Sequence, residues 1–404
     1  MRILYIHQHF NTPKGSVGTR SYEFSKALIQ NGHSVTVICG SYGTGSTGLT
    51  MEFEKGVRRG LVDGIDVIEL NLAYSNEDSF IKRGFTFFRF AGRATLFALR
   101  EDYDVVVATS TPLTAGIPGI FSRWLRHKTF VFEVRDLWPE LPREMGVITN
   151  PIVLSALSLL EWASYHSANR CIGLAPGIID GIHGRGIDRS KIRLISNGCD
   201  LDVFGGNVTD WRPEGVLSTD LMAVYAGTHG VANGLGSVLD AAGVLMRRGR
   251  SDIKIVFVGE GKQKKALQER ASREGLDNVI FHPAVDKFRL AGLMASADIG
   301  LQILDNVPAF YFGTSPNKFF DYISAGLPVL NNYPGWVAEL IEKHQCGFSV
   351  EPENSNAFAD ALESAASNGD DLKLMGMRAK SCAEDYFDRN MLSQKWIDWV
   401  VGAG

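Results

Sequence analysis

Cysteine is scarce in this chain, with five among 404 residues and no two in CxxC spacing. They stand at Cys39, Cys171, Cys199, Cys346 and Cys382. An odd number of scattered cysteines argues against a disulfide framework and against a zinc site. The pattern indicates a reducing compartment, and we expect all five to be small core residues.

The chain also lacks long apolar runs and a strong net charge. No run reaches membrane-spanning length, and no small-residue cleavage site follows the opening MRILYIHQHF, which is therefore predicted to be a strand. The formal net charge is −4, which does not favour nucleic acid as a partner. We expect a protein that is cytoplasmic, either soluble or peripheral to a membrane.

One glycine motif does not carry the function that its spacing suggests. GTGSTG, from Gly43 to Gly48, matches GxGxxG, but it follows the second strand and no convincing helix opens after it. We interpret it as a polar loop. No DxD-type carboxylate pair stands beside a phosphate loop, so no essential metal ion is predicted.

Apolar strands and amphipathic helices alternate along the chain, which predicts parallel α/β sheets. The first unit runs from RILYIHQHF through a glycine loop and a helix to SVTVICG. The pattern restarts at LMAVYAGTHG, after a linker-like stretch over 205–218. We predict an α/β protein with Rossmann-like domains at 1–204 and 205–384, and a last helix at 385–404 that returns to the first domain.

The segment SPNKFFDYISAGLPVL has the signals of a helix with both of its ends. Ser315 suits the N-cap and Pro316 the first helical position, while Gly326 suits the residue after the helix. Lys318 then falls in the first turn, where a positive charge opposes the helix dipole. Free backbone N–H groups and a lysine together suit an anion. A solvated lysine whose stem covers aromatic rings explains the pattern equally well.

Further segments, in the same order as in a known family, favour the anion site. The chain resembles the retaining family-4 glycosyltransferases of the two-domain GT-B fold, in which two Rossmann-like domains have parallel sheets facing a central cleft. The segments that carry the resemblance are HQHFNTPKGSVGTRSYEFSKALIQNGHSVTV, LISNGCDLDVF, YAGTHGVANGL, FVGEGKQKKAL, SPNKFFDYISAGLPVL and YPGWVAELIEKHQCGFSVEP. FEVRDLWPELPREMGVI resembles a subgroup that builds bacterial surface polysaccharides, including N-acetyl-fucosaminyl transferases.

The resemblance implies a donor site for a UDP-sugar. It assigns Lys318 to the diphosphate and Asp321 to the ribose, with Lys264 in support. The chain has Gly313, Thr228 and Asn233 where the family has a glutamate, an arginine and a lysine. The full set of expected donor-binding residues is Gly18, His229, Asn233, Lys264, Pro283, Val285, Ser315, Asn317, Lys318 and Asp321.

The resemblance also implies an acceptor side in the first domain. Arg135 and Asp136 follow an apolar strand and are expected to be catalytic, with Asp136 as the base for the acceptor hydroxyl. A structural ion pair or a turn cap is the alternative for these two residues. Gly15 and Ser16 are expected in the acceptor-side loop.

The resemblance implies transfer of a sugar with retention, from a UDP-sugar to a lipid-diphosphate-linked saccharide, for lipopolysaccharide O-antigen or capsule synthesis. Phe80–Asp102 and Phe121–Lys128 interleave basic and aromatic residues and are predicted to contact an anionic membrane at its inner face. Core-packing helices with solvated arginines are the alternative. For the whole chain, a UDP-sugar 2-epimerase-like enzyme and a non-catalytic sugar-nucleotide-binding subunit remain open.

Overall fold

Two α/β units make up the chain, and each is described by itself. The computed structural model describes residues 1–15, 18–42, 45–74, 78–206 and 208–404. Unit 1 comprises Met1–Ser196, Gly313–Ser315 and Asn390–Gly404, and unit 2 comprises Asn197–Phe312 and Pro316–Arg389. The chain thus crosses between units after Ser196, Phe312, Ser315 and Arg389, whereas the sequence-based limits stand after residues 204 and 384.

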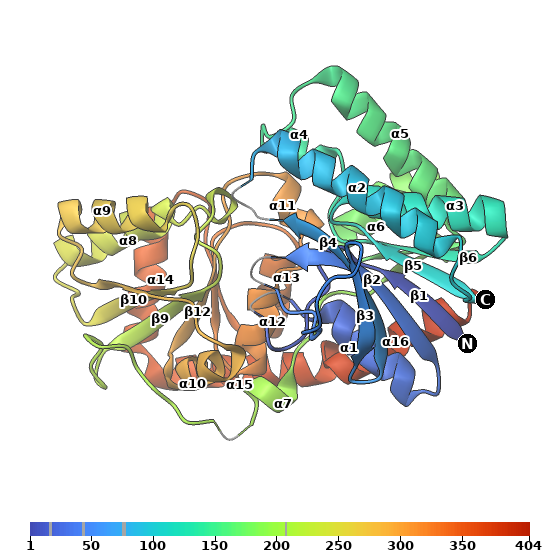
Figure 1. Cartoon of the computed structure of the whole chain (residues 1–404). Helices are drawn as coiled ribbons and strands as arrows, with labels where there is room; N and C mark the ends of the chain where they lie inside the picture. The colour runs from blue at the N-terminus through green and yellow to red at the C-terminus, as the bar shows by residue number, and fades with distance from the viewer. Residues whose placement is uncertain (16–17, 43–44, 75–77, 207) are drawn as a thin grey trace. The chain divides into compact units, whose positions relative to one another are not determined.

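Unit 1 contains a sheet with strand order β3-β4-β2-β1-β5-β6-β7-β8, in which every neighbouring pair except β3–β4 is parallel (Figure 1). The strands are β1 (Arg2–Ile6), β2 (Ser34–Tyr42), β3 (Val57–Val62), β4 (Ile65–Tyr74), β5 (Val105–Thr109), β6 (Thr129–Val134), β7 (Arg170–Gly173) and β8 (Ile192–Leu194). The α-helices are α1 (Arg20–Gln30), α2 (Phe80–Ala98), α3 (Gly116–Arg126), α4 (Glu140–Glu144), α5 (Pro151–Ser167), α6 (Pro176–Gly184) and α16 (Arg389–Val401).

The sequence analysis did not predict the antiparallel strand β3. It joins β4 through Asp63 and Gly64, whose φ angles are +50° and +86°. Two successive positive φ angles define the tight hairpin turn that Asp-Gly favours. The dipeptide was therefore the signal that could have revealed this hairpin.

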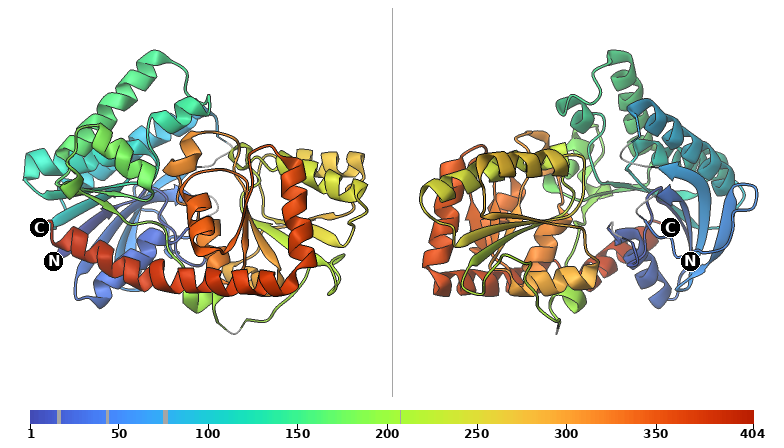
Figure 2. Two further views of the ribbon diagram at one scale, coloured as in Figure 1. Left: turned by 180° about the vertical axis from the view of Figure 1, so that it is seen from behind. Right: turned by 60° about the vertical axis from the view of Figure 1, so that its left-hand side comes forward.

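Helices cover both faces of the unit 1 sheet (Figure 1). Helices α2, α3 and α5 lie on one face, with α3 in contact with both of the others. Helices α1 and α16 lie on the opposite face, where Trp396 of α16 packs against Phe24 of α1. The two chain ends lie beside each other in this unit (Figure 2).

Unit 2 contains a fully parallel sheet with strand order β11-β10-β9-β12-β13-β14. Its strands are β9 (Leu221–Ala226), β10 (Ile253–Val258), β11 (Val279–His282), β12 (Ile299–Gln302), β13 (Val329–Asn331) and β14 (Gly347–Ser349). Its α-helices are α7 (Leu201–Phe204), α8 (Gly236–Arg247), α9 (Lys264–Glu274), α10 (Lys287–Ser296), α11 (Ala309–Gly313), α12 (Asn317–Ser324), α13 (Trp336–His344), α14 (Ser355–Ser367) and α15 (Gly369–Tyr386). Two Rossmann-like parallel-sheet units confirm the predicted fold class.

The predicted role of the cysteines is confirmed. All five are free and buried, at no more than 1% exposure. Burial raises the pKa of the Cys171 thiol to about 12, so this thiol stays protonated at neutral pH.

Candidate functional site

Helix α12 begins one residue later than the sequence predicted. The N-cap is Pro316, with ψ of 121°, and the helix starts at Asn317. The prediction of Ser315 as N-cap is wrong, because the extended backbone of Pro316 separates Ser315 from the first turn. The other end is confirmed: Gly326 has φ of +72° just beyond the helix, as a residue after a helix C-terminus requires.

Lys318 in the first turn of α12 faces the loop that follows β9. Its Nζ lies 3.4 Å from Oδ1 of Asn233 and 5.1 Å from the ring centroid of Tyr225. A Cβ atom added to Gly227 would lie 3.1 Å from Cδ of Lys318, so a larger residue would crowd the lysine side chain. Burial lowers the pKa of Lys318 to about 8. The structure therefore brings Lys318 and Asn233 together, while Asn317 is exposed.

Asp321 lies one turn further along α12, next to a half-buried charge cluster. Burial raises its pKa to about 7; Lys287 and Arg389 oppose this shift and Asp200 adds to it. Asp200 itself forms ion pairs with both Lys287 and Arg389. Sequence reasoning missed this cluster, because its members come from three segments far apart in the chain.

His229 is fully buried, and neither ring nitrogen has a hydrogen-bond partner within the described part of the chain. The rings of Tyr225, Phe257 and Phe281 surround it at centroid distances of 6.0, 5.9 and 6.2 Å. Burial, followed by the charge of Lys264, lowers its pKa to about 4, so the ring is neutral. With no exposed surface, the ring has no access to a ligand in this structure, and its expected role stays a prediction.

Lys264 holds the loop after β10 in place. Its Nζ donates to the carbonyl of Gly259 at 2.9 Å and to Oε1 of Glu260 at 2.7 Å. Two of the other expected donor residues lie in the loop after β11, where Pro283 is exposed and Val285 is half-buried. These residues follow neighbouring strands and so share one edge of the unit 2 sheet.

Arg135 and Asp136 directly follow β6 in unit 1, as predicted. The Arg135 N–H donates to Oγ of Ser110 at 2.9 Å, and Nη1 lies 3.3 Å from Nε2 of His7. Oδ2 of Asp136 accepts a hydrogen bond from the Thr111 hydroxyl at 3.1 Å. Burial raises the pKa of Asp136, and the charge of Arg135 opposes that shift. Within the described residues, the side-chain partners of Arg135 and Asp136 are His7 and Thr111 rather than each other, and the catalytic roles and the turn-cap alternative stay predictions.

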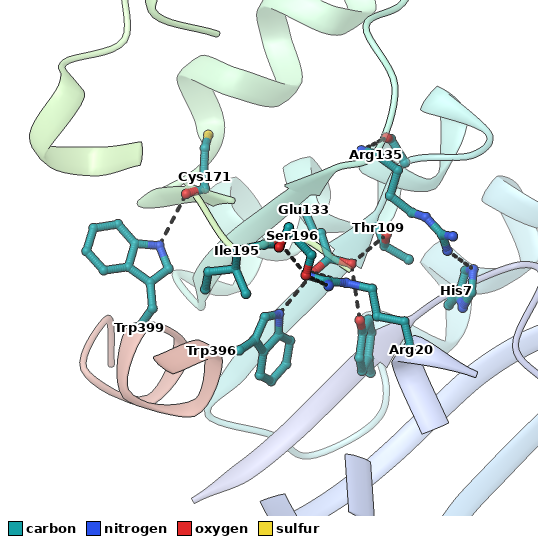
Figure 3. A network of polar contacts seen from close by, with 12 residues as sticks. His7, Arg20, Thr109, Glu133, Arg135, Cys171, Ile195, Ser196, Trp396 and Trp399 are labelled. Atoms are coloured by element: carbon teal, nitrogen blue, oxygen red, sulfur yellow. Dashed lines mark hydrogen bonds and ion pairs between the residues drawn. The ribbon is translucent and has the colours of Figure 1, made fainter. Parts of the chain in front are cut away.

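A buried carboxylate network lies next to Arg135 (Figure 3). Glu133 is 1% exposed and accepts from Arg20 Nη2 at 3.0 Å, from Trp396 Nε1 at 3.0 Å and from Thr109 Oγ1 at 3.1 Å. Arg20 also donates to the carbonyls of Ile195 and Ser196. The network therefore ties α16 to the sheet, and sequence reasoning did not foresee it.

The glycines of the N-terminal loop differ in their surroundings. A Cβ atom on Gly15 would lie 2.0 Å from Oδ1 of Asn11, so the loop cannot hold a larger residue there without moving Asn11. Gly18 is exposed. Ser16, the other acceptor-side residue predicted from the sequence, lies outside the described residues.

The part of the chain that the structure describes has neither a cluster of metal ligands nor a helix that could span a membrane. No group of three or more His, Cys, Asp or Glu side chains there is arranged to hold a metal ion. No helix there is long and apolar enough to cross a membrane.

Comparisons with known families agree with a fold of two α/β units. Residues 15–198 match the family described as "Glycosyl transferase 4-like domain", and residues 221–368 match "Glycosyl transferases group 1". Two successive glycosyltransferase domains on two Rossmann-like units make the chain a glycosyltransferase of the GT-B type. A comparison with curated proteins found no match.

Several solved structures share this fold along their full length. HepE from Anabaena, solved in complex with UDP, is 17% identical over 100% of both chains, with a TM-score of 0.71. WaaG, a glycosyltransferase involved in lipopolysaccharide biosynthesis, is 17% identical over 99% of this chain and 100% of its own, with a TM-score of 0.70. Sucrose-phosphate synthase from Thermosynechococcus elongatus is 15% identical over 98% of this chain and 97% of its own, with a TM-score of 0.73.

Proposed function

We propose that the chain is a retaining glycosyltransferase that moves a sugar from a UDP-sugar to a lipid-diphosphate-linked saccharide in bacterial surface polysaccharide synthesis. We expect the sugar to be N-acetylated. The observation that carries the proposal is the Lys318 amine in the first turn of α12, 3.4 Å from Asn233 and facing the Gly227 loop. Structures with the same fold, solved with UDP and with UDP-glucose, support the donor class.

In the proposed reaction, the departing UDP carries developing negative charge. The first-turn N–H groups of α12 and the Lys318 ammonium group stabilise that charge, and Asp321 accepts a hydrogen bond from the ribose. Asp136 takes the proton of the acceptor hydroxyl, a role that its raised pKa suits. No step needs a metal ion, because the lysine and the helix terminus supply the positive charge.

Thermal shifts with UDP, GDP and dTDP test the donor site. A ligand at 100 times its Kd adds about 2.7 kcal/mol of stability. We expect a shift with UDP that Lys318→Ala removes. Lys265→Ala is the matched control, because this lysine is 88% exposed and pairs with Glu269 on the surface of α9. If no nucleotide shifts the wild-type protein, the donor site is absent.

The two alternatives make different predictions for the products. A UDP-sugar 2-epimerase keeps the nucleotide attached to the sugar, whereas a transferase releases free UDP when an acceptor is present. A non-catalytic subunit binds UDP without releasing products. Chromatography of nucleotides after incubation with a panel of UDP-sugars and a lipid-linked acceptor separates these outcomes.

The proposed lipid-linked acceptor requires contact with a membrane, and one face of unit 1 suits that contact. The exposed apolar side chains on this face are Ile81, Phe85, Phe88 and Leu96 on α2, Phe121, Trp124 and Leu125 on α3, and Ile152, Leu159 and Trp162 on α5. Helix α2 adds exposed cations at Lys82 and Arg89, and the exposed Arg100 follows the helix. Sequence reasoning chose α2 and α3 and missed α5.

We propose that this face binds the anionic inner surface of the cell membrane. The protein should float with liposomes that contain anionic lipid, and the double variant Phe85→Ser with Phe88→Ser should float less. Leu61→Ser on β3 is the control, because Leu61 is 76% exposed but lies outside the three helices. Absence of binding to any liposome rules out the membrane face.

A further inference from the structure

A buried histidine connects the Arg135 side chain to helix α1. His7 follows β1 and is 2% exposed. Its Nδ1 lies 2.7 Å from Oγ of Ser21, and its Nε2 lies 3.3 Å from Nη1 of Arg135. Figure 3 shows His7 and Arg135 pointing toward each other. One imidazole thus joins the end of β1, the first turn of α1 and the end of β6.

These partners determine the protonation state of the ring. A guanidinium has N–H donors and no acceptor, so Nε2 must offer its lone pair to Arg135. The ring proton is then on Nδ1, which donates to the hydroxyl oxygen of Ser21. Burial lowers the pKa of His7 well below its usual value, and the charges of Arg135, His9 and Arg20 lower it further. The ring is therefore neutral, in the Nδ1–H tautomer.

Arg135 keeps its charge available in this arrangement. Of the acidic side chains closest to it in sequence, Glu133 pairs with Arg20, and Asp136 accepts a hydrogen bond from Thr111. In the described ranges of the chain, Arg135 forms no ion pair, and the hydrogen-bond partner of its guanidinium is the neutral His7. A neutral acceptor orients a guanidinium without neutralising it, which suits a cation that must receive an anion.

We propose that His7 is a positioning residue: held as the Nδ1–H tautomer by Ser21, it fixes the Arg135 guanidinium in one orientation for an anionic group of the substrate. The identity of that substrate rests on the proposed function. The orientation itself rests on the Ser21–His7–Arg135 geometry. The fixed acceptor limits the rotamers of a long side chain, whose ordering would otherwise oppose ligand binding.

Kinetics of single and double variants test the coupling. Loss of a hydrogen bond to a charged group predicts a drop of roughly 10- to 100-fold in kcat/KM for His7→Phe, and loss of the neutral bond that orients the ring predicts a drop of roughly 2- to 10-fold for Ser21→Ala. In the Arg135→Ala background the same changes should have no further effect, and His7→Gln, which retains an acceptor, should recover most of the activity. If the KM for the donor rises, the anionic group that Arg135 binds belongs to the donor; if the KM for the acceptor rises, it belongs to the acceptor.

Ser25→Ala is the matched control for Ser21→Ala. Ser25 is a fully buried serine one turn further along α1, and its hydroxyl donates to the Ser21 carbonyl rather than to His7. Equal losses for the two serine variants would overturn the proposal. Losses that remain in the Arg135→Ala background would overturn it as well.

Nitrogen-15 NMR of the histidine-labelled full chain tests the tautomer without any turnover. The signals of His7 are assigned by their loss in His7→Gln. We expect a neutral ring with its proton on Nδ1 at about pH 6.5, the ordinary pKa of histidine, and above, because a buried histidine beside a guanidinium resists protonation. An Nε2–H tautomer or an imidazolium in this range would overturn the proposal. This measurement tests the His7 tautomer even if no UDP-sugar is turned over. Failure of the positioning role can therefore be told apart from failure of the proposed transferase function.

Discussion

Replacing Trp396 with phenylalanine removes a hydrogen bond to the buried Glu133 carboxylate and keeps an aromatic ring in place. Trp396 is 0% exposed, and its Nε1 lies 3.0 Å from Oε2 of Glu133. Its ring stacks on Tyr5 at a centroid distance of 5.6 Å and lies 4.9 Å from the ring of Phe24. The substitution therefore tests the polar contact by which α16 is held to the sheet.

The structure allows the loss to be estimated. A hydrogen bond to a charged group contributes about 1.5–3 kcal/mol, and the smaller ring leaves a cavity that costs roughly 1 kcal/mol. Glu133 keeps Arg20 and Thr109 as donors, so the carboxylate is not stranded. We expect Trp396→Phe to lower the free energy of unfolding by about 3 kcal/mol.

Trp399 provides a matched control on the same helix. Its Nε1 donates to the neutral carbonyl of Cys171 at 3.2 Å, and its ring, which is not fully buried, lies beside Arg170. A neutral hydrogen bond contributes about 0.5–1.5 kcal/mol, so Trp399→Phe should cost about 1 kcal/mol. The difference between the two variants combines the charge of Glu133 with the cavity that the smaller ring leaves at the fully buried Trp396.

Urea unfolding followed by far-UV circular dichroism measures both variants, because tryptophan fluorescence is itself changed by the substitutions. A protein of two units can unfold in more than one step, so the comparison is made on the transition that the variants shift. Equal losses for Trp396→Phe and Trp399→Phe would refute the reasoning. Glu133→Gln leaves Arg20 as a buried charge without a counter-ion and should cost more than either, about 3–5 kcal/mol.

Three further predictions concern pH, packing and thiols. Asp321 has a folded pKa of about 7 against an ordinary 3.8, so the folded state binds its proton more tightly, and stability falls as pH rises from about 4 to 7. The Tm of Asp321→Asn relative to wild type should rise over that window, and a constant difference would contradict the assignment. Gly15→Ala should lower the Tm by displacing Asn11, whereas Gly84→Ala, with no atom within 4 Å of the new Cβ, should not; equal melting would show that the loop accommodates the methyl group. All five thiols should resist a colorimetric thiol reagent until the protein unfolds, and rapid labelling of the folded protein would disprove their burial.

The sequence predicted most of the fold because its signals are local. The five residues of β5 are all buried apolar or small residues, as expected for a parallel strand with helices on both faces. Gly326 predicted the end of α12 through a backbone conformation that glycine favours. The start of α12 was misplaced by one residue because serine and proline are both frequent near helix N-termini, and composition alone cannot decide which of them caps.

The candidate site was predicted in part. The sequence placed Lys318 in a first turn and Arg135 at the end of a strand, since both positions follow from local pattern. It could not show that Asn233 lies beside Lys318 or that His7 lies beside Arg135, because these pairs are 85 and 128 residues apart. For His229 the sequence left a donor-binding role and a buried structural role open, and the structure buries the ring among aromatic side chains, so the donor-binding role stays a prediction.

By itself, then, the sequence determined the alternation of strands and helices, the glycosyltransferase resemblance and the buried thiols, because each depends on neighbouring residues or on order along the chain. Only the tertiary structure determined which charged side chains lie in contact. Glu133 forms an ion pair with Arg20, whereas the Arg135 guanidinium contacts the neutral His7. Asp200 forms ion pairs with Lys287 and Arg389 close to Asp321. Electrostatic interactions depend on distance in space and on burial, and neither quantity is written in local sequence pattern.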